Sequence, residues 1–308
     1  MKRLSLVIPI YLNLESLPEL LNRLQQVETL LNSISIELEV ITVIDGSTDT
    51  SMDYLESRRK DFNKLIILEL TRNFGSPKAV KAGYSEASGD AIVAISADLQ
   101  DPPELVIEMC KAWLDGSEIV ICERSSRRDP WISKIFSNII YWLIRTLVMP
   151  TYPKGGFDVS LIDSKYKDLV VRSSKSTYIP ILIYWFGISP TIICYERRKR
   201  IHGKSSWTFG KKMNLFSDIL FGFSIRPIRF ISTLGLVISL IGIALAFFYF
   251  WNAFYNHIAV PGWATIVILQ SLFSGITFLM LGIISEYIWR IFSELDKKPE
   301  FIIKKVID

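Results

Sequence analysis

Oxygen-bearing side chains gather on residues 96–104, a short segment that reads Ser-Ala-Asp-Leu-Gln-Asp-Pro-Pro-Glu. Asp98 and Gln100 follow an apolar, strand-like run, and carboxylate and amide oxygens are the ligands that hard divalent ions prefer. An ion held here would bridge a diphosphate and stabilise it as a leaving group. A helix start explains the same residues, with Asp101 as N-cap and Pro102 at the first helical position. Both can hold, so we predict Mg²⁺ or Mn²⁺ at Asp98 and Gln100 and a helix cap at Asp101.

A second acidic turn, Asp45-Gly46-Ser47-Thr48-Asp49, closes another apolar run. The Asp45 carboxylate could accept the ring N–H of a nucleotide base, and Gly46 permits a tight turn. An ordinary strand-to-helix turn, with Ser47 or Thr48 as N-cap, explains the same residues. Taken alone, this segment favours the ordinary turn.

Both turns need a framework, and the first half of the chain alternates strand-like and helix-like patterns. The predicted strands are 4–10, 39–44, 64–71, 91–96 and 118–122, and the predicted helices are 17–31, 48–59, 78–88 and 103–114. This alternation is typical of an α/β fold whose mostly parallel sheet is covered on both faces. Such sheets bind ligands beyond the carboxyl ends of their strands. We therefore expect the chemistry in the loops at 9–13, 45–49, 72–75 and 98–104.

Residues 230–285 contain no Lys, Arg, Asp or Glu, a stretch long enough for two bilayer-crossing helices and a turn. We expect the helices near 230–252 and 263–289. A buried hairpin of a soluble protein is the alternative, but core helices rarely stay uncharged on every face. Basic residues flank both ends of the stretch, which favours a multi-pass protein of the inner (plasma) membrane with both ends in the cytoplasm. No cleavable signal is apparent, so residues 1–229 are expected in the cytoplasm.

Charge and cysteine content narrow the function classes. The net charge is +4, and no basic stripe with interleaved aromatic residues is present, so we expect no nucleic-acid partner. Cys110, Cys122 and Cys194 show no paired spacing and are expected to be reduced core residues. Residues 133–148 and 211–223 are amphipathic, and each suits a core-facing helix or a helix at a membrane surface.

Several short motifs follow one another in an order that is more specific than any one of them. They are Ile8-Pro9 with Asn13, residues 45–49, Thr71-Arg72-Asn73-Phe74-Gly75, residues 97–104, Gly155-Gly156-Phe157-Asp158, Glu196-Arg197, residues 200–205, and Glu286-Tyr287-Ile288 with Arg290. With two apolar helices near the end, the chain resembles the family 2 glycosyltransferases of the polyprenyl-phosphate branch. That branch includes dolichol-phosphate mannose synthases and, more similar to this chain, bacterial bactoprenol-phosphate glucosyltransferases.

The resemblance implies a GT-A type nucleotide-sugar-binding fold and an inverting mechanism. Asp45 matches the acid that contacts the base, Asp98 with Gln100 matches the metal site, and Pro9 and Asn73 lie in donor-binding motifs. Arg124 matches a phosphate-contacting arginine, and Arg200 and Ser205 fall on the loop that closes over donor and lipid phosphate. Asp158 matches an acid proposed to act in catalysis. Three positions depart from the pattern: Ile44 and Ser96 each replace an aspartate, and Ser206 replaces a lysine.

The expected reaction transfers a hexose, with UDP-glucose as the first choice of donor, to polyisoprenyl (undecaprenyl) phosphate. The acceptor is already an anion near pH 7, so catalysis should depend on positioning and charge neutralisation. Six arginines could match phosphate groups, although Arg198 alone suits a solvated surface position: Arg124, Arg127, Arg128, Arg197, Arg198 and Arg200. A GDP-mannose-dependent synthase and a catalytically weak membrane scaffold remain as alternatives. The sequence is also compatible with a homo-oligomer.

The expected division has a GT-A domain over 1–210, an amphipathic juxtamembrane segment over 211–229, a two-helix transmembrane hairpin over 230–290 and a cytoplasmic tail over 291–308.

Overall fold

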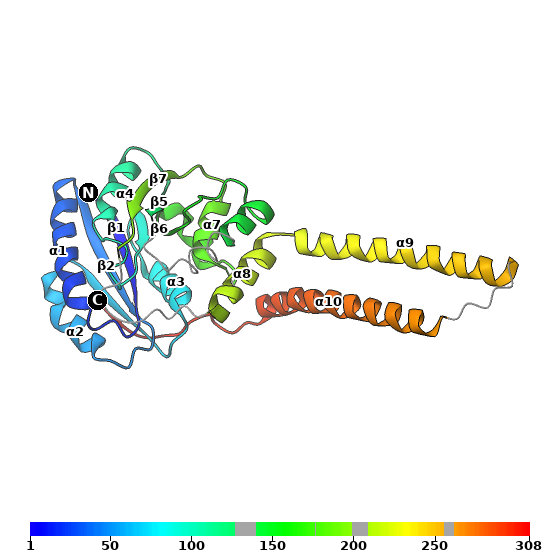
Figure 1. Cartoon of the computed structure of the whole chain (residues 1–308). Helices are drawn as coiled ribbons and strands as arrows, with labels where there is room; N and C mark the ends of the chain where they lie inside the picture. The colour runs from blue at the N-terminus through cyan, green and yellow to red at the C-terminus, as the bar shows by residue number, and fades with distance from the viewer. Residues whose placement is uncertain (127–139, 176, 199–208, 256–261) are drawn as a thin grey trace. The chain divides into compact units, whose positions relative to one another are not determined.

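The structure is a computed structural model that describes residues 1–126, 140–175, 177–198, 209–255 and 262–308 (Figure 1). The chain forms two compact units. The sheet unit contains Met1–Asp218 and Lys298–Asp308, and the helical unit contains Ile219–Lys297. The chain therefore leaves the sheet unit once and returns to it with its last described residues.

An eight-stranded mixed sheet forms the centre of the sheet unit, in the order β7-β5-β6-β4-β1-β2-β3-β8. The strands are β1 (Lys2–Ile10), β2 (Ile36–Ile44), β3 (Leu65–Leu70), β4 (Ala91–Ala94), β5 (Ile119–Ser126), β6 (Phe157–Asp163), β7 (Thr191–Glu196) and β8 (Ile303–Ile307). The β1–β2, β1–β4, β2–β3 and β5–β7 pairs are parallel, whereas β6 and β8 run antiparallel to their neighbours. The predicted α/β fold with a mostly parallel sheet is confirmed.

Helices cover both faces of this sheet, which explains why its central strands are mostly apolar. Leu4, Leu6 and Ile8 of β1 belong to the core that also contains residues of α1 (Leu17–Ser33) and α4 (Leu105–Leu114). Val7 points the other way, toward Gly83 of α3 (Ser76–Glu86). Because alternate residues of a strand face opposite sides, α3 lies on the face opposite α1 and α4. The remaining short helices are α2 (Ser51–Arg58), η1 (Arg59–Asp61), η2 (Ser164–Tyr166), α6 (Lys167–Val171) and α7 (Ile179–Trp185).

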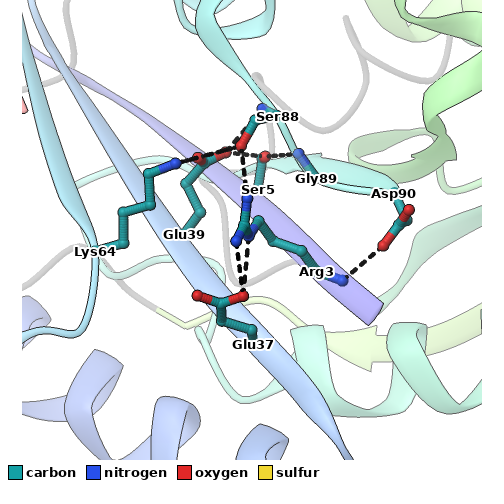
Figure 2. Close-up of polar contacts among 8 residues, drawn as sticks. All are labelled: Arg3, Ser5, Glu37, Glu39, Lys64, Ser88, Gly89 and Asp90. Carbon is teal, nitrogen blue, oxygen red and sulfur yellow. Dashed lines mark hydrogen bonds and ion pairs between the residues drawn. The ribbon is translucent and has the colours of Figure 1, made fainter. Parts of the chain in front are cut away.

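A polar cluster lies where β1 and β2 begin and just before β3 and β4, at the amino-end edge of the parallel strands (Figure 2). Glu39 of β2 is fully buried and accepts hydrogen bonds from Ser5 and from both the backbone and the hydroxyl of Ser88. Lys64 adds an ion pair, with 2.6 Å between its Nζ and a Glu39 oxygen. Nearer the surface, Arg3 pairs with Glu37 at 2.9 Å.

The last strand was not predicted, because the sequence was interpreted as a cytoplasmic tail over 291–308. Instead β8 pairs antiparallel with β3, and the Thr71 amide donates to Ile302 at 3.0 Å. The segment before β8 is also held: the Nζ of Lys81, a residue that is only 2 % exposed, lies 3.0 Å from a Glu300 oxygen. The same ammonium donates to the carbonyl of Ser173 at 2.8 Å. The end of the chain is thus part of the sheet unit.

The helical unit contains two long apolar helices, α9 (Arg226–Tyr255) and α10 (Trp263–Leu295), which run antiparallel beside each other (Figure 1). By length and composition, the parts at 226–245 and 272–295 could each cross a membrane, and almost none of their residues are buried in the protein. Their positions agree with the predicted spans. The helix α8 (Phe209–Phe223) precedes them and crosses the boundary between the two units in sequence. Of the predicted helix at 133–148, the structure describes helical residues 140–147.

The cysteines match the prediction in part. All three are free, and Cys110 and Cys122 are buried as expected. Cys194, by contrast, is exposed on the edge strand β7, so its assignment to the core was wrong.

Candidate functional site

The loops that follow β1, β2 and β3 are fastened to one another at the carboxyl-end edge of the sheet. Asp45 is 2 % exposed, and its two oxygens accept from the backbone amides of Phe74 and Gly75 at 2.7 and 2.8 Å. Burial raises the pKa of Asp45, and these two hydrogen bonds offset part of that effect. Gly46 has a φ of +62°, and a Cβ there would lie 2.3 Å from the Asn73 amide nitrogen. Only glycine therefore lets the β2 loop approach the β3 loop so closely.

The β1 loop is joined to the β2 loop by a second pair of residues. The Ser47 hydroxyl accepts from the Leu12 amide at 2.9 Å, and it donates to Asp49 at 2.7 Å. Asp49 also accepts from the Leu14 amide at 3.3 Å. These hydrogen bonds outweigh partial burial and lower the pKa of Asp49. Residues 45–49 thus connect the loops after β1, β2 and β3 at the carboxyl-end edge of the sheet. Asn73, in the β3 loop, is exposed.

The loop after β4 carries the predicted metal ligands. Asp98 is 7 % exposed and accepts from the Gln100 amide at 3.1 Å, in a turn that gives Leu99 a φ of +59°. Asp101 is buried and accepts from the hydroxyl of Tyr195 on β7, and it lies 3.4 Å from Nε of Arg197. The helix α4 begins only at Leu105, so the predicted cap at Asp101 is wrong. Its carboxylate is instead directed to β7.

Arg124 and Asp158, predicted separately from motifs 34 positions apart, form an ion pair. Arg124 lies toward the end of β5 and Asp158 at the start of β6. Because β6 runs antiparallel to β5, its first residues reach the same sheet edge as the carboxyl ends of the parallel strands. The other Asp158 oxygen accepts from the Tyr178 hydroxyl at 3.0 Å. The Asp158 side chain is 39 % exposed, whereas that of Arg124 is only 6 % exposed.

The paired glycines before Asp158 are required by this close approach. A Cβ on Gly155 would lie 2.3 Å from the Arg124 carbonyl oxygen, and the Gly155 amide donates to Glu123 at 2.8 Å. Gly156 has a φ of +63°, and a Cβ there would collide with the ring of Tyr141. The turn therefore presses the start of β6 against the end of β5, which sets Asp158 beside Arg124.

Arg124 and the acids beside it lie among tyrosine hydroxyl groups, and these groups influence one another's pKa values. Burial alone would lower the pKa of Arg124, but Tyr141, Tyr195 and Asp101 together raise it above the ordinary value, so the guanidinium stays charged. Burial raises the pKa of Tyr178 and of Tyr195 far above neutrality, and both remain phenols that can donate. In the described part of the chain, Nε of Arg124 is buried without a hydrogen-bond partner. A buried, charged and partly unsatisfied guanidinium is suited to an incoming anion.

The donor set fits a divalent ion that arrives with a diphosphate. Among the residues that the structure describes, no three acidic, histidine or cysteine side chains come together as a resident metal site. Asp98 offers one carboxylate beside Gln100, and Ser96 supplies no second acid in that triplet. Mg²⁺ is commonly held by one or two carboxylates together with substrate phosphates, so one carboxylate is a sufficient protein contribution.

The remaining predicted residues have mixed outcomes. Pro9 lies on β1 opposite Val43 of β2, one residue before that strand ends. Arg200, Ser205 and Ser206 fall outside the described residues, and so do Arg127 and Arg128. The sequence reasoning missed Tyr178 and Tyr195, which hold Asp158 and Asp101. Their only signal was a tyrosine in or next to an apolar segment, which is equally typical of a core residue.

Comparison with known proteins identifies the family. The profile described as glycosyl transferase family 2 matches residues 5–157. An uncharacterized glycosyltransferase of Synechocystis sp., sll0501, is 32 % identical over 97 % of this chain and 94 % of its own length. The uncharacterized glycosyltransferase YkcC of Bacillus subtilis is 32 % identical over 98 % of this chain and 93 % of its own length.

Among solved structures, one is of glucosyl-3-phosphoglycerate synthase from Mycobacterium tuberculosis in complex with Mn²⁺, UDP and glucosyl-3-phosphoglycerate. It aligns with a TM-score of 0.47 and 14 % identity over 71 % of this chain and 79 % of that one. The family match and the two full-length relatives, together with the mixed α/β sheet described above, confirm the GT-A type fold. The chain belongs to glycosyl transferase family 2.

Proposed function

We propose that this chain transfers a hexose from a nucleotide sugar to a polyisoprenyl phosphate, with inversion at the sugar carbon, and UDP-glucose is the first donor to test. One observation carries the proposal: Arg124 and Asp158 form an ion pair at the sheet edge that also bears the Asp98 loop. A guanidinium for phosphate, a carboxylate for the acceptor and a loop for a metal-bound diphosphate would then meet in one place. The two apolar helices of the same chain suit a lipid acceptor.

In the proposed reaction, an acceptor phosphate oxygen attacks the anomeric carbon while the bond from that carbon to the diphosphate breaks. A nucleoside diphosphate leaves, and an α-linked donor gives a β-linked lipid product. Asp98 and Gln100 would hold Mg²⁺ or Mn²⁺, which neutralises charge on the leaving diphosphate. Arg124 would contact the phosphates from the sheet edge, and its burial makes each charge-assisted hydrogen bond stronger than in water.

Asp158 would meet the acceptor. Asp158 is more exposed than Arg124 and Tyr178, the two residues that it contacts. These contacts already orient both of its oxygens. In that position it would orient the lipid phosphate or take its remaining proton, since the second ionisation of a phosphate monoester lies near pH 6. Arg200 and Ser205, which lie outside the described residues, are proposed to contact the same phosphate.

The proposal is tested with the full chain in liposomes that contain undecaprenyl phosphate. Nucleotide sugars are offered one at a time, and the lipid-linked product is extracted and counted. UDP-glucose should give product that needs both the lipid phosphate and a divalent ion. Product from GDP-mannose instead would change the donor, and absence of lipid-linked sugar with every donor would overturn the proposed acceptor.

Asp158→Asn separates the two roles of the carboxylate. We expect turnover to fall about a hundredfold or more while donor affinity is kept, because the residue faces the acceptor. If Asp158 removes a proton, raising the pH should partly restore turnover, because the acceptor then arrives fully ionised. Slow transfer without this rescue assigns Asp158 to orientation, and unchanged transfer would remove it from catalysis.

The membrane arrangement is proposed from the apolar spans and their basic flanks. A cysteine placed at Asn256 should react with an impermeant reagent added outside intact cells, whereas one at Lys297 should not. The parent chain serves as control because Cys194 is exposed in the structure. Equal labelling at both positions, or labelling at Lys297 alone, would contradict two crossings with cytoplasmic ends.

A further inference from the structure

Tyr178 lies where α7 begins, and its hydroxyl contacts the Asp158 carboxylate at 3.0 Å. The backbone that presents it is held firmly, because the first five residues of α7 are all buried: Ile179, Pro180, Ile181, Leu182 and Ile183. Tyr178 itself forms no side-chain cap for this helix. Its hydroxyl is therefore not needed to start α7, and its contact with Asp158 calls for another explanation.

The two partners of Asp158, Arg124 and Tyr178, differ in charge and are therefore expected to respond differently when a phosphate binds. Arg124 is a buried cation, and under the proposed function it contacts the phosphates. As the guanidinium shares its charge with an incoming anion, its hold on Asp158 weakens. Tyr178 is an uncharged phenol near neutral pH, and burial raises its pKa further, so it can keep donating to Asp158 when phosphate arrives. The phenol is thus the contact that does not compete with the substrate.

Orientation matters here because the Asp158 side chain is 39 % exposed. A carboxylate of this exposure held at one oxygen only can rotate, and a reacting group that rotates away loses the advantage of prior positioning. A donor on the second oxygen removes that freedom at no cost during the reaction.

We propose that Tyr178 is a positioning residue for transfer, which holds the Asp158 carboxylate toward the acceptor once Arg124 engages phosphate. The inference rests on the proposed role of Asp158. It predicts that the phenolic hydroxyl affects turnover, acts through Asp158 and leaves donor binding alone. Tyr178 does not touch the reacting atoms in this scheme.

The test is Tyr178→Phe, which deletes one oxygen and keeps the ring. Turnover should fall about tenfold to a hundredfold, the range expected for a hydrogen bond to a charged group. The KM for the donor and the thermal unfolding midpoint should stay at the parent values. The matched control is Tyr184→Phe on the same helix, whose hydroxyl donates to the Thr151 carbonyl at 2.6 Å and should leave turnover unchanged.

Combining Tyr178→Phe with Asp158→Asn shows whether Tyr178 acts through the carboxylate. If it does, the double variant should be no slower than Asp158→Asn alone. Full multiplication of the two losses would overturn the inference, and so would turnover of Tyr178→Phe within twofold of the parent. A loss in Tyr178→Phe that comes with a lower unfolding midpoint and an equal loss in Tyr184→Phe would assign both hydroxyls to structure only.

The outcomes also separate this inference from the function on which it rests. Slow Asp158→Asn with normal Tyr178→Phe would remove Tyr178 and keep Asp158. Normal transfer by a folded Asp158→Asn chain would instead remove the catalytic role of Asp158 itself, whatever Tyr178→Phe does.

Discussion

The two edges of one sheet use similar residues in opposite ways. At the amino-end edge, Glu39 is fully buried and receives Ser5, Ser88 and Lys64, so its charge is satisfied within the protein (Figure 2). At the carboxyl-end edge, Asp158 is 39 % exposed and its partner Arg124 keeps a buried nitrogen without a hydrogen bond in the described chain. The amino-end edge is closed because its charges are satisfied within the protein, whereas the carboxyl-end edge keeps an exposed carboxylate and a partly unsatisfied guanidinium.

The pKa values of two buried acids, one at each edge, shift in opposite directions. Burial alone would raise the pKa of Glu39, but its hydrogen bonds and Lys64 lower it below the ordinary value. For Asp45 at the other edge, burial outweighs the two backbone hydrogen bonds and the pKa is raised. The ionised form of Glu39 therefore stabilises the fold. The ionised form of Asp45 is disfavoured by burial, and the two backbone hydrogen bonds from the β3 loop offset only part of that cost. Burial of an acid does not reveal its role until its partners are known.

The largest expected effect is a loss of activity on changing the Asp98 loop at the carboxyl-end edge. Asp98→Asn keeps the size of the side chain and removes the charge offered to a divalent ion, so turnover should fall about a hundredfold or more. Stability should change little, and a chelator should abolish the activity of the parent chain until Mg²⁺ or Mn²⁺ is restored. Full activity in excess chelator would reduce the Asp98 loop to a structural turn.

Glu39→Gln tests the closed edge. The free energy of unfolding should fall by about 2–4 kcal/mol, because buried donors and the Lys64 ammonium lose a charged partner. Turnover per folded molecule should be unchanged. Denaturant unfolding of the purified protein measures the first quantity and a transfer assay the second; a loss of turnover without a loss of stability would erase the contrast between the edges.

The lowered pKa of Glu39 also predicts a pH dependence with a definite sign. Its stabilising contribution is fully present above the unfolded pKa, which is about 4.3, and is lost as the pH falls through the lower folded pKa. Below pH 4.3 the parent should therefore lose stability more steeply than Glu39→Gln. Parallel curves of unfolding midpoint against pH for the two proteins would show that Glu39 does not contribute in this way.

The smallest effect is expected at the surface of the closed edge. Arg3 and Glu37 pair at 2.9 Å, but each side chain is 35 % exposed and solvent screens the pair. Arg3→Gln should cost less than about 1 kcal/mol in unfolding free energy. A cost as large as that of Glu39→Gln would mean that the whole amino-end cluster acts as one unit.

The sequence predicted the parts of the fold whose pattern is local. Strands β1 to β5 are apolar runs, and the helices between them have clear periodicity, so their positions agree within a few residues. The strands β6, β7 and β8 were not predicted. Residues 191–196 of β7 are largely exposed at an edge, and β8 carries Lys304 and Lys305, so neither resembles a buried strand. Their pairing depends on partners that are distant in the sequence.

The site divides in the same way. Motifs identified Arg124 and Asp158, but their ion pair results from the antiparallel placement of β6, which no local pattern encodes. The suggestion that Asp45 contacts a base stays a prediction. In the structure its two oxygens accept from the backbone amides of Phe74 and Gly75, 29 and 30 positions later, and no local pattern could have indicated these partners. Tyr178 meets Asp158 across 20 positions, and only the fold brings them together.

The sheet can be completed only late in synthesis, because β8 is the last strand to be made. A ribosome delivers β3 early, yet the strand that pairs with its outer edge emerges only after both long helices of the helical unit. Until then the edge of β3 presents unpaired backbone groups, which invite pairing with other chains. The buried ammonium of Lys81 likewise awaits Glu300. A nascent chain that exposes residues 1–297 outside the ribosome should therefore be digested faster by added protease than one that exposes residues 1–308, because the sheet closes only after the apolar helices have been made.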